Sequence, residues 1–142
     1  MIKKLGIEDY PKIQALWESA GLSWRAEGRD HPDRIRRQIE SQSIFLLGEV
    51  EKEELRGVVL VSHDSRKGWL NRLAVHPHYR NQQIAQQLIK AAEDLLYNEN
   101  GIEVFCTLIF DDNVASTSLF EKVGYESWSE VKYYSKRKRS DA

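Results

Sequence analysis

A polar turn between an apolar segment and a long amphipathic one holds the residues best suited to bind a charged ligand. Residues 71–75 are mostly apolar, and residues 76–83 are mostly polar. Residues 84–96 then place apolar side chains at helical spacing. A helix that begins directly after a turn leaves its first main-chain N–H groups without partners in the helix, and its dipole favours negative charge there. The sequence therefore predicts a phosphate-binding site at the start of this helix.

Composition and charge limit the classes of function. The chain has 142 residues, of which 41% are hydrophobic and 30% charged, and this predicts one globular domain over residues 1–142. The formal net charge of −1 excludes a global attraction to nucleic acid or to acidic membranes. Nucleic-acid binding through Arg34, Arg36, Arg37 and the basic residues of the tail stays open as an alternative, although such arginines more often form a solvated helix face.

Cysteine content and hydropathy exclude further classes. Cys106 is the only cysteine, so the chain can form neither an internal disulfide nor a cysteine-based metal cluster, and no metal is expected. The first residues lack the apolar core of a signal peptide, and no apolar run is long enough to span a membrane. We therefore expect a cytoplasmic protein.

Hydrophobic periodicity and turn residues predict an α/β (α+β) fold. The predicted helices cover residues 6–20, 84–96 and 114–123, with another from about residue 32, and the predicted strands cover 2–5, 43–50, 55–63, 69–75, 103–110, 125–130 and 131–135. Short connections predict an antiparallel meander, and the helical crossover predicts that strand 103–110 lies parallel to strand 69–75. The expected sheet is mixed and mostly antiparallel, with six to seven strands and about four helices. Residues 136–142 are expected to form a frayed basic tail.

Two motifs occur in this order of elements. Arg80, Gln83 and Ala85 match a turn of the form Arg/Gln-x-x-Gly-x-Gly/Ala, and the lead-in Leu-Ala-Val-His-Pro precedes it at 73–77. The second motif covers residues 113–125 and ends in Gly-Tyr. With both motifs in this order, the chain resembles the GNAT superfamily of acyl-CoA-dependent N-acetyltransferases over nearly its whole length. The resemblance implies a sheet that splays between its fourth and fifth strands.

The resemblance implies acetyl-CoA as the co-substrate. Main-chain N–H groups of the turn would bind its pyrophosphate, and the pantetheine arm would run beside strand four at Leu73 and Val75. Asn113 would contact the other side of the arm, although an asparagine here is equally typical of a helix N-cap. Arg80 would lie in the turn, although it can also be interpreted as an ordinary surface arginine. The cofactor-binding residues implied in this way are Leu73, Ala74, Val75, Arg80, Asn81, Gln82, Gln83, Ile84, Ala85, Asn113 and Phe120.

Two positions depart from the turn that the family uses. The family usually has glycine where Gln83 stands, and often where Asn81 stands. Glycine lets the main chain approach a phosphate closely and adopt unusual dihedral angles. We expect Gln83 to take ordinary helical geometry with its side chain turned away, which would keep the main-chain donors in place.

The general acid has no obvious candidate. Many relatives place a tyrosine where this chain has Phe120, and its hydroxyl protonates the departing thiolate. Phenylalanine carries no proton to give. The thiolate would be protonated by water or by Tyr133 or Tyr134, which also read as ordinary strand aromatics.

The sequence also leaves several candidates for the general base. An amine acceptor must lose a proton before it attacks a thioester, but strand four offers no carboxylate. Asn71 on that strand could order a water that carries the proton away. Asp30, His31 and His78 could lie near the mouth of the site, although a histidine is more often a surface residue than a base.

The function implied by the resemblance is direct transfer of an acetyl group from acetyl-CoA to a primary amine in a ternary complex. The alternative is a non-catalytic acyl-CoA-binding module with a degenerate site. The acceptor, a small-molecule or peptide amine, would contact residues 22–33 and 126–135, as in relatives. No nucleic-acid or membrane partner is expected, and the fold is compatible with a homodimer.

Overall fold

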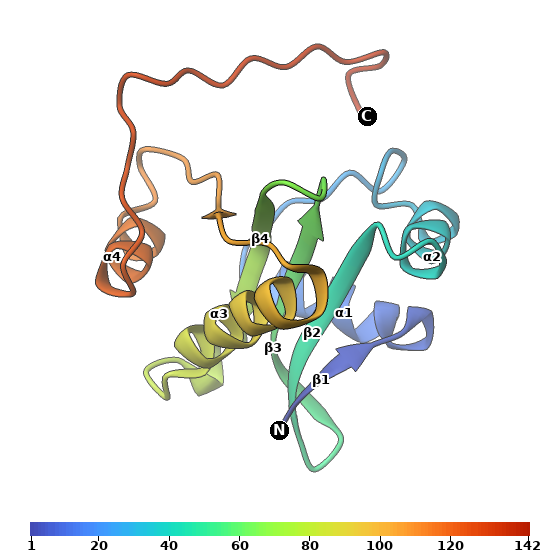
Figure 1. Cartoon of the computed structure of the whole chain (residues 1–142). Coiled ribbons are helices and arrows are strands. Elements are labelled where there is room, and N and C mark those ends of the chain that lie inside the picture. The colour runs from blue at the N-terminus through green and yellow to red at the C-terminus, as the bar shows by residue number, and fades with distance from the viewer.

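A five-stranded sheet forms the centre of the structure, a computed structural model that describes residues 1–142 (Figure 1). Its strands lie in the order β1 (Ile2–Leu5), β2 (Ile44–Glu51), β3 (Glu54–His63), β4 (Gly68–Val75) and β5 (Phe105–Cys106). The first four strands are antiparallel to their neighbours, and β5 pairs parallel to β4. The sheet is therefore mixed and mostly antiparallel.

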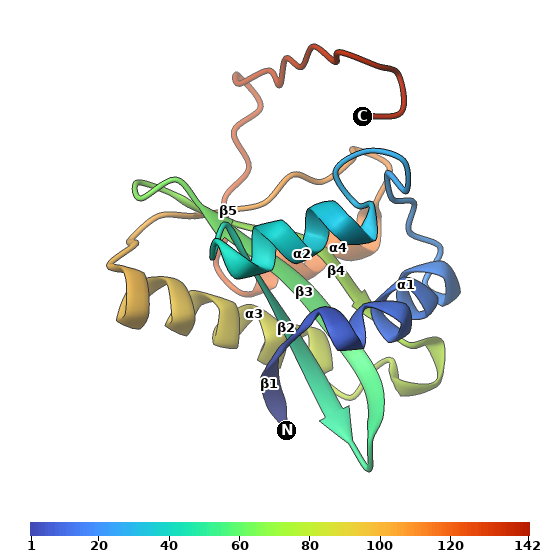
Figure 2. The same ribbon diagram turned by 90° about the vertical axis from the view of Figure 1, so that its right-hand side faces the viewer.

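Four α-helices cover the two faces of the sheet. They are α1 (Tyr10–Ser19), α2 (Pro32–Glu40), α3 (Ile84–Asp94) and α4 (Val114–Lys122), with 3₁₀ turns at Ile7–Asp9 and Pro77–Tyr79 and a π-helical turn at Leu95–Glu99. Side chains of α1 and α2 pack with Leu46 and Val58, whereas α3 packs with Leu47 and Val59. Because successive residues of a strand face opposite ways, these are the two faces of the sheet. Figure 2 shows α3 on one side of the sheet and α1 on the other.

The predicted meander and crossover are confirmed. Strands β2, β3 and β4 follow one another as antiparallel neighbours, and α3 carries the chain back to a parallel β5. The apolar face expected on the helix after the polar turn is buried, with Leu88, Ile89, Ala92 and Leu95 in the core. No helix of the structure combines the length and the apolar character needed to cross a membrane.

The predicted number of six to seven strands is wrong, because the sheet has five. Residues 126–135 form no strand, and their one main-chain hydrogen bond as donor runs from the Val131 N–H to the Trp128 carbonyl. The predicted strand at 103–110 pairs only at Phe105 and Cys106, so β5 offers a very short edge. A strand needs a neighbouring edge to satisfy its main-chain groups. Without one, the chain after α4 runs along the surface.

The C-terminal segment reaches the loop between α1 and α2 (Figure 1). An Arg139 guanidinium nitrogen donates to the Glu27 carbonyl oxygen, at 2.9 Å. Gly28 is buried beneath the end of the chain, and a Cβ at this glycine would lie 2.5 Å from the Asp141 carbonyl oxygen. Residues 22–33 and the tail are therefore brought together, although they are at opposite ends of the sequence.

Candidate active site

The turn between β4 and α3 presents a run of free main-chain donors. His76 begins the 3₁₀ turn at Pro77–Tyr79, where its Nδ1 accepts from the His78 N–H at 3.2 Å. From Arg80 to Gln86, no main-chain N–H makes a hydrogen bond of ordinary geometry to another group of the protein. The first helical bonds of α3 start beyond them, with the Gln87 N–H donating to the Gln83 carbonyl at 3.1 Å. These donors, at the positive end of a helix dipole, suit a phosphate.

Asn81 and Gln83 adopt the backbone conformation that glycine favours. Their φ angles are 66° and 62°, in the left-handed region. The expectation that Gln83 takes ordinary helical geometry is therefore wrong. A left-handed conformation costs an ordinary residue about 1–2 kcal/mol, and asparagine tolerates it better than glutamine. The turn thus keeps the dihedral angles of a glycine turn while carrying other residues.

The start of α3 lies close against β3. Gly57 in β3 makes this approach possible, because a Cβ at this position would lie 2.8 Å from the Ile84 side chain and 3.0 Å from that of Leu88. Ile84 is buried in the core, while the neighbouring Gln82 and Gln83 are exposed. The core therefore fixes the helix start and leaves the donors of the turn at the surface.

Strand β4 separates from β5 beside this turn, as expected. The two strands pair only at Gly68 with Phe105 and at Trp69 with Cys106. Beyond that point, the Thr107 hydroxyl donates to the Leu70 carbonyl at 2.7 Å in place of a ladder bond. From Asn71 to Val75, the edge of β4 that faces β5 has no ladder partner, so an extended ligand could add to it in the manner of a strand.

A β-bulge interrupts β4 at Arg72. Leu60 pairs with Asn71 and Val58 pairs with Ala74, so Val59 alone faces two residues of β4. Arg72 has a φ of 52°, and its guanidinium lies over the Trp17 ring, 5.2 Å from the centroid. One guanidinium nitrogen lies 2.5 Å from the Asp30 carboxylate, an ion pair whose angle is not that of a regular hydrogen bond. Arg72 was not among the predicted site residues.

The Asp30 carboxylate is occupied by its ion pair with Arg72, so it is not available as a general base. Asp30 is buried, with 3% of its surface exposed, and its carboxylate also accepts from the Arg25 N–H at 2.6 Å. The Tyr10 hydroxyl donates to the Asp30 carbonyl at 2.7 Å, and burial raises the pKa of that hydroxyl. Asp30 therefore joins the loop at 22–33 to α1 and to the bulge of β4.

The remaining candidates for proton transfer are dispersed. His31 caps α2, since its Nδ1 accepts from the Asp33 N–H at 3.2 Å, and His78 is exposed beside the 3₁₀ turn. Tyr133 and Tyr134 are exposed on the extended tail, so the description of them as strand aromatics is wrong. Asn71 is half-buried next to the bulge, on the free edge of β4. Asn71 is thus the one sequence candidate that lies beside both the bulge and the splayed edge.

Asn113 and Phe120 have clear structural roles. Asn113 caps α4, with its Oδ1 accepting from the Ser116 N–H at 3.1 Å, which confirms the N-cap interpretation. Phe120 is in the core and packs edge-on against Tyr125, with ring centroids 4.9 Å apart. The Tyr125 hydroxyl donates to Glu93 at 2.8 Å, and burial raises its pKa. No tyrosine hydroxyl replaces the missing one at position 120.

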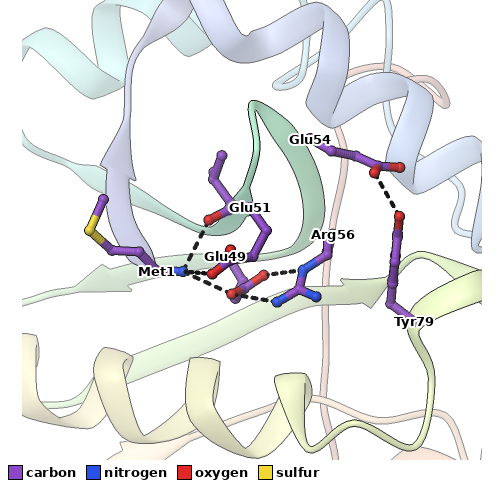
Figure 3. A network of polar contacts seen from close by, with 7 residues as sticks. Met1, Glu49, Glu51, Glu54, Arg56 and Tyr79 are labelled. Carbon is purple, nitrogen blue, oxygen red and sulfur yellow. Dashed lines mark hydrogen bonds and ion pairs between the residues drawn. The ribbon is translucent and has the colours of Figure 1, made fainter.

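A polar network supports the turn from behind (Figure 3). Tyr79 donates to the Glu54 carboxylate at 2.6 Å and lies 5.3 Å from the Arg56 guanidinium. Arg56 in turn makes two hydrogen bonds to Glu49, at 2.7 and 2.8 Å, which lower the pKa of that carboxyl. The Met1 amine also donates to Glu49, at 2.9 Å. Sequence spacing gave no signal for this network, because its members come from separate strands and from the turn.

Comparison with known proteins agrees with this geometry. Residues 13–125 match the family described as the Acetyltransferase (GNAT) family. A curated acetyltransferase of Sodalis glossinidius (strain morsitans) is 31% identical over 130 residues, which cover 92% of this chain and 89% of that protein. The chain therefore belongs to the GNAT family of acetyltransferases.

Solved structures share the fold at lower sequence identity. The aminoglycoside acetyltransferase AAC(6')-Iy, in complex with the bisubstrate analogue CoA-S-monomethyl-acetylneamine, has a TM-score of 0.79 at 18% identity, with 96% of this chain and 97% of that chain covered. A ribosomal-protein-alanine N-acetyltransferase from Brucella melitensis biovar Abortus 2308 has a TM-score of 0.74 at 18% identity, with coverages of 96% and 99%. These neighbours act on chemically different amines, so the shared fold does not identify an acceptor.

Proposed function

We propose that this protein transfers an acetyl group from acetyl-CoA directly to a primary amine in a ternary complex. The observation that carries the proposal is the run of free N–H groups from Arg80 to Gln86. Membership of an acetyltransferase family and the CoA-containing analogue bound to a structural neighbour support the same assignment. The departures at Asn81 and Gln83 do not weaken it, because both residues take the glycine conformation.

The donor half of the proposed site uses main-chain groups. The N–H groups of the turn would bind the pyrophosphate, with the exposed Arg80 side chain adding positive charge beside it. The free edge of β4 at Leu73 and Val75 would hold the pantetheine arm, and Asn113 would lie across from it. Phe120 would contribute only its ring, as part of the apolar wall.

In this reaction a carbon–nitrogen bond forms and a carbon–sulfur bond breaks. The amine nitrogen attacks the thioester carbonyl, the carbon–sulfur bond breaks, and the amine loses a proton while the thiolate gains one. A main-chain N–H at the free edge of β4 would polarise the carbonyl. Asn71 would order the water that takes the proton, and solvent would protonate the thiolate, since Phe120 has no hydroxyl and that of the half-buried Tyr125 is bonded to Glu93. Positioning of the two reactants supplies much of the rate in such a reaction.

Ligand binding and turnover test the proposal separately. A thermal-shift titration compares acetyl-CoA and CoA with pantetheine, which lacks the pyrophosphate. Because a ligand that binds the native state stabilises it, by about 2.7 kcal/mol at a hundredfold excess over Kd, we expect a clear shift with the first two ligands and little with pantetheine. No shift at millimolar CoA would contradict the cofactor assignment.

Turnover is followed as free thiol released from acetyl-CoA in the presence of a panel of primary amines. We expect amine-dependent thiol release that saturates with both substrates. Saturable acetyl-CoA binding without thiol release across a broad panel would instead identify a non-catalytic binding module.

A further inference from the structure

A strongly basic groove lies between the α1–α2 loop and the C-terminal tail. Its volume is about 540 Å³, and six of its nine lining residues have cationic side chains while none has an acidic side chain. The cations are Arg29, Arg34, Lys136, Arg137, Lys138 and Arg139. We call this the basic groove. Its charge contrasts with the formal net charge of −1 of the whole chain.

Three of these cations, Arg34, Lys136 and Lys138, have no anionic partner. Arg139 pairs with Asp141 at 3.4 Å, and Arg29 and Arg137 bind the last residue of the sequence, Ala142. Burial lowers the pKa of Arg29, and the nearby charges of Arg72 and Arg137 lower it further. Like charges held together repel one another, so an anion placed among them is stabilised.

Two guanidinium groups of the basic groove converge on a single oxygen atom. Arg29 and Arg137 both donate to an oxygen of Ala142, the last residue of the sequence, at 3.3 and 2.7 Å, so they hold its carboxyl group. They come from opposite ends of the sequence, so the fold and not local spacing creates this arrangement. The same geometry suits a carboxylate or phosphate oxygen, for which arginine is the preferred donor.

The basic groove adjoins the splayed strand. Arg29 is followed directly by Asp30, whose carboxylate pairs with Arg72 in the bulge of β4. Asn71 and Leu73 flank that bulge, on the edge where the acetyl group would lie in the proposed function. The Asp30–Arg72 pair therefore connects the loop that carries Arg29 to the bulge of β4.

We propose that the basic groove holds an anionic group of the acceptor, so that the acceptor is an amine that also carries a carboxylate or a phosphate. This inference rests on the proposed acetyl transfer and adds the substrate class to it. Electrostatic complementarity selects partners by charge, so the basic groove attracts an acidic acceptor and repels a polycationic one. A nucleic acid is the less suitable ligand, because the cations are confined to one groove on a chain of slightly negative net charge.

The test uses acceptors that share one amine and differ in charge. Three peptides begin with the same alanine and continue with glutamate, glutamine or lysine residues, and ethanolamine is compared with its phosphate ester to separate carboxylate from phosphate recognition. We expect the acidic peptide to have a KM about tenfold below that of the neutral one, and this difference to shrink at high salt.

Variants connect that preference to the basic groove. Arg29→Gln and Arg34→Gln should each raise KM for the acidic peptide more than KM for the neutral peptide, so the preference for the acidic peptide shrinks. Arg37→Gln is the matched control, because Arg37 is an exposed arginine of α2 that does not line the basic groove. Equal use of the three peptides, or equal effects of Arg29→Gln and Arg37→Gln, would overturn the proposal.

A direct binding measurement tests the basic groove independently of the proposed acetyl transfer. A fluorescent acidic peptide with a blocked amine is titrated into the protein with CoA present, and its anisotropy is measured for wild type and for Arg29→Gln. Weakened binding in the variant supports the basic groove even if no amine is acetylated, in which case only the proposed reaction fails. Tight binding of a single-stranded oligonucleotide, without preference for the acidic peptide, would overturn the proposal in favour of a nucleic-acid surface.

Discussion

The two halves of the proposed site are built in opposite ways. The donor half, from the turn at 76–83 into α3, offers main-chain N–H groups fixed by a buried helix start. The acceptor half, from the loop at 22–33 and the tail, offers charged side chains on segments without strands or helices. Main-chain binding tolerates changes of side chain, as Asn81 and Gln83 show by keeping the glycine conformation. Side-chain recognition changes with each substitution, so acceptor choice can diverge among proteins that share one donor site.

A buried ion pair joins the two halves. Asp30 belongs to the acceptor loop and Arg72 to the strand of the donor half, and their ion pair lies over Trp17. If the halves act independently apart from this contact, breaking it should damage the acceptor half and spare CoA binding. The variants below test that division, from the largest expected effect to the smallest.

Asp30→Ala should have the largest effect. It leaves Arg72 buried without its charge partner, and removing one member of a buried pair costs about 3–5 kcal/mol. We expect that loss in urea unfolding, a fall in kcat/KM for amines, and an acetyl-CoA Kd within about twofold of wild type, since the N–H groups that would bind the pyrophosphate lie in the turn from Arg80 to Gln86 and not in the bulge. Asp33→Ala is the control, because its ion pair with Arg36 is exposed. A similar loss of CoA affinity and of amine turnover would show that the halves are not separable.

Phe120→Tyr tests whether position 120 belongs to the chemistry or to the core. Phe120 is 4% exposed, and a buried hydroxyl without a partner costs about 1–3 kcal/mol. We expect lower stability and no gain in kcat, with Phe110→Tyr, at an exposed site, as a neutral control. A higher kcat for Phe120→Tyr would mean that the ring reaches the leaving thiolate, which would give the donor half a side-chain role.

Gln83 tests the claim that the donor half depends on backbone conformation. Gln83→Val places a β-branched residue at a φ of 62°, and we expect a further loss on the order of 1 kcal/mol in unfolding free energy, beyond the cost that Gln83 already carries, together with weaker CoA binding. Gln83→Gly accepts this conformation and should bind CoA at least as well as wild type. Gln87→Val, at an exposed position of α3, controls for the helix propensity of valine. Equal CoA affinity of the Gly and Val variants at position 83 would refute the claim.

The sequence was informative for the donor half and much less so for the acceptor half. The meander, the crossover and the buried face of α3 follow from periodicity and short connections, and they are confirmed. The conformation of Gln83 was missed because propensity disfavours it, and the tertiary position of α3 against Gly57 overrides propensity. The pair of Asp30 with Arg72 had no local signal, since only the bulge of β4 brings the two together. The strands expected at 126–135 failed because β5 offers too short an edge.

The smallest expected effect concerns the network behind the turn, which links the donor half to β2 and β3. Arg56 lowers the pKa of Glu49 by hydrogen bonding, and Glu49 is buried. A carboxyl whose folded pKa is lowered stabilises the protein above its unfolded pKa, and this contribution disappears as the pH falls through the folded pKa. We therefore expect Glu49→Gln to be less stable than wild type at pH 7, with the gap closing as the pH falls through the ordinary range of a glutamate and below it.

Urea unfolding of both proteins from pH 7 down to pH 3 measures that gap, with Glu40→Gln, at an exposed site of α2 outside the network, as the control. CoA affinity should fall slightly in Glu49→Gln, because Arg56 then holds the Tyr79 ring less firmly at the start of the turn. A gap that stays constant with pH would mean that Glu49 is not the titrating group. An unchanged CoA affinity would mean that the donors of the turn are held by α3 alone, which would make the donor half more independent of its surroundings than the network suggests.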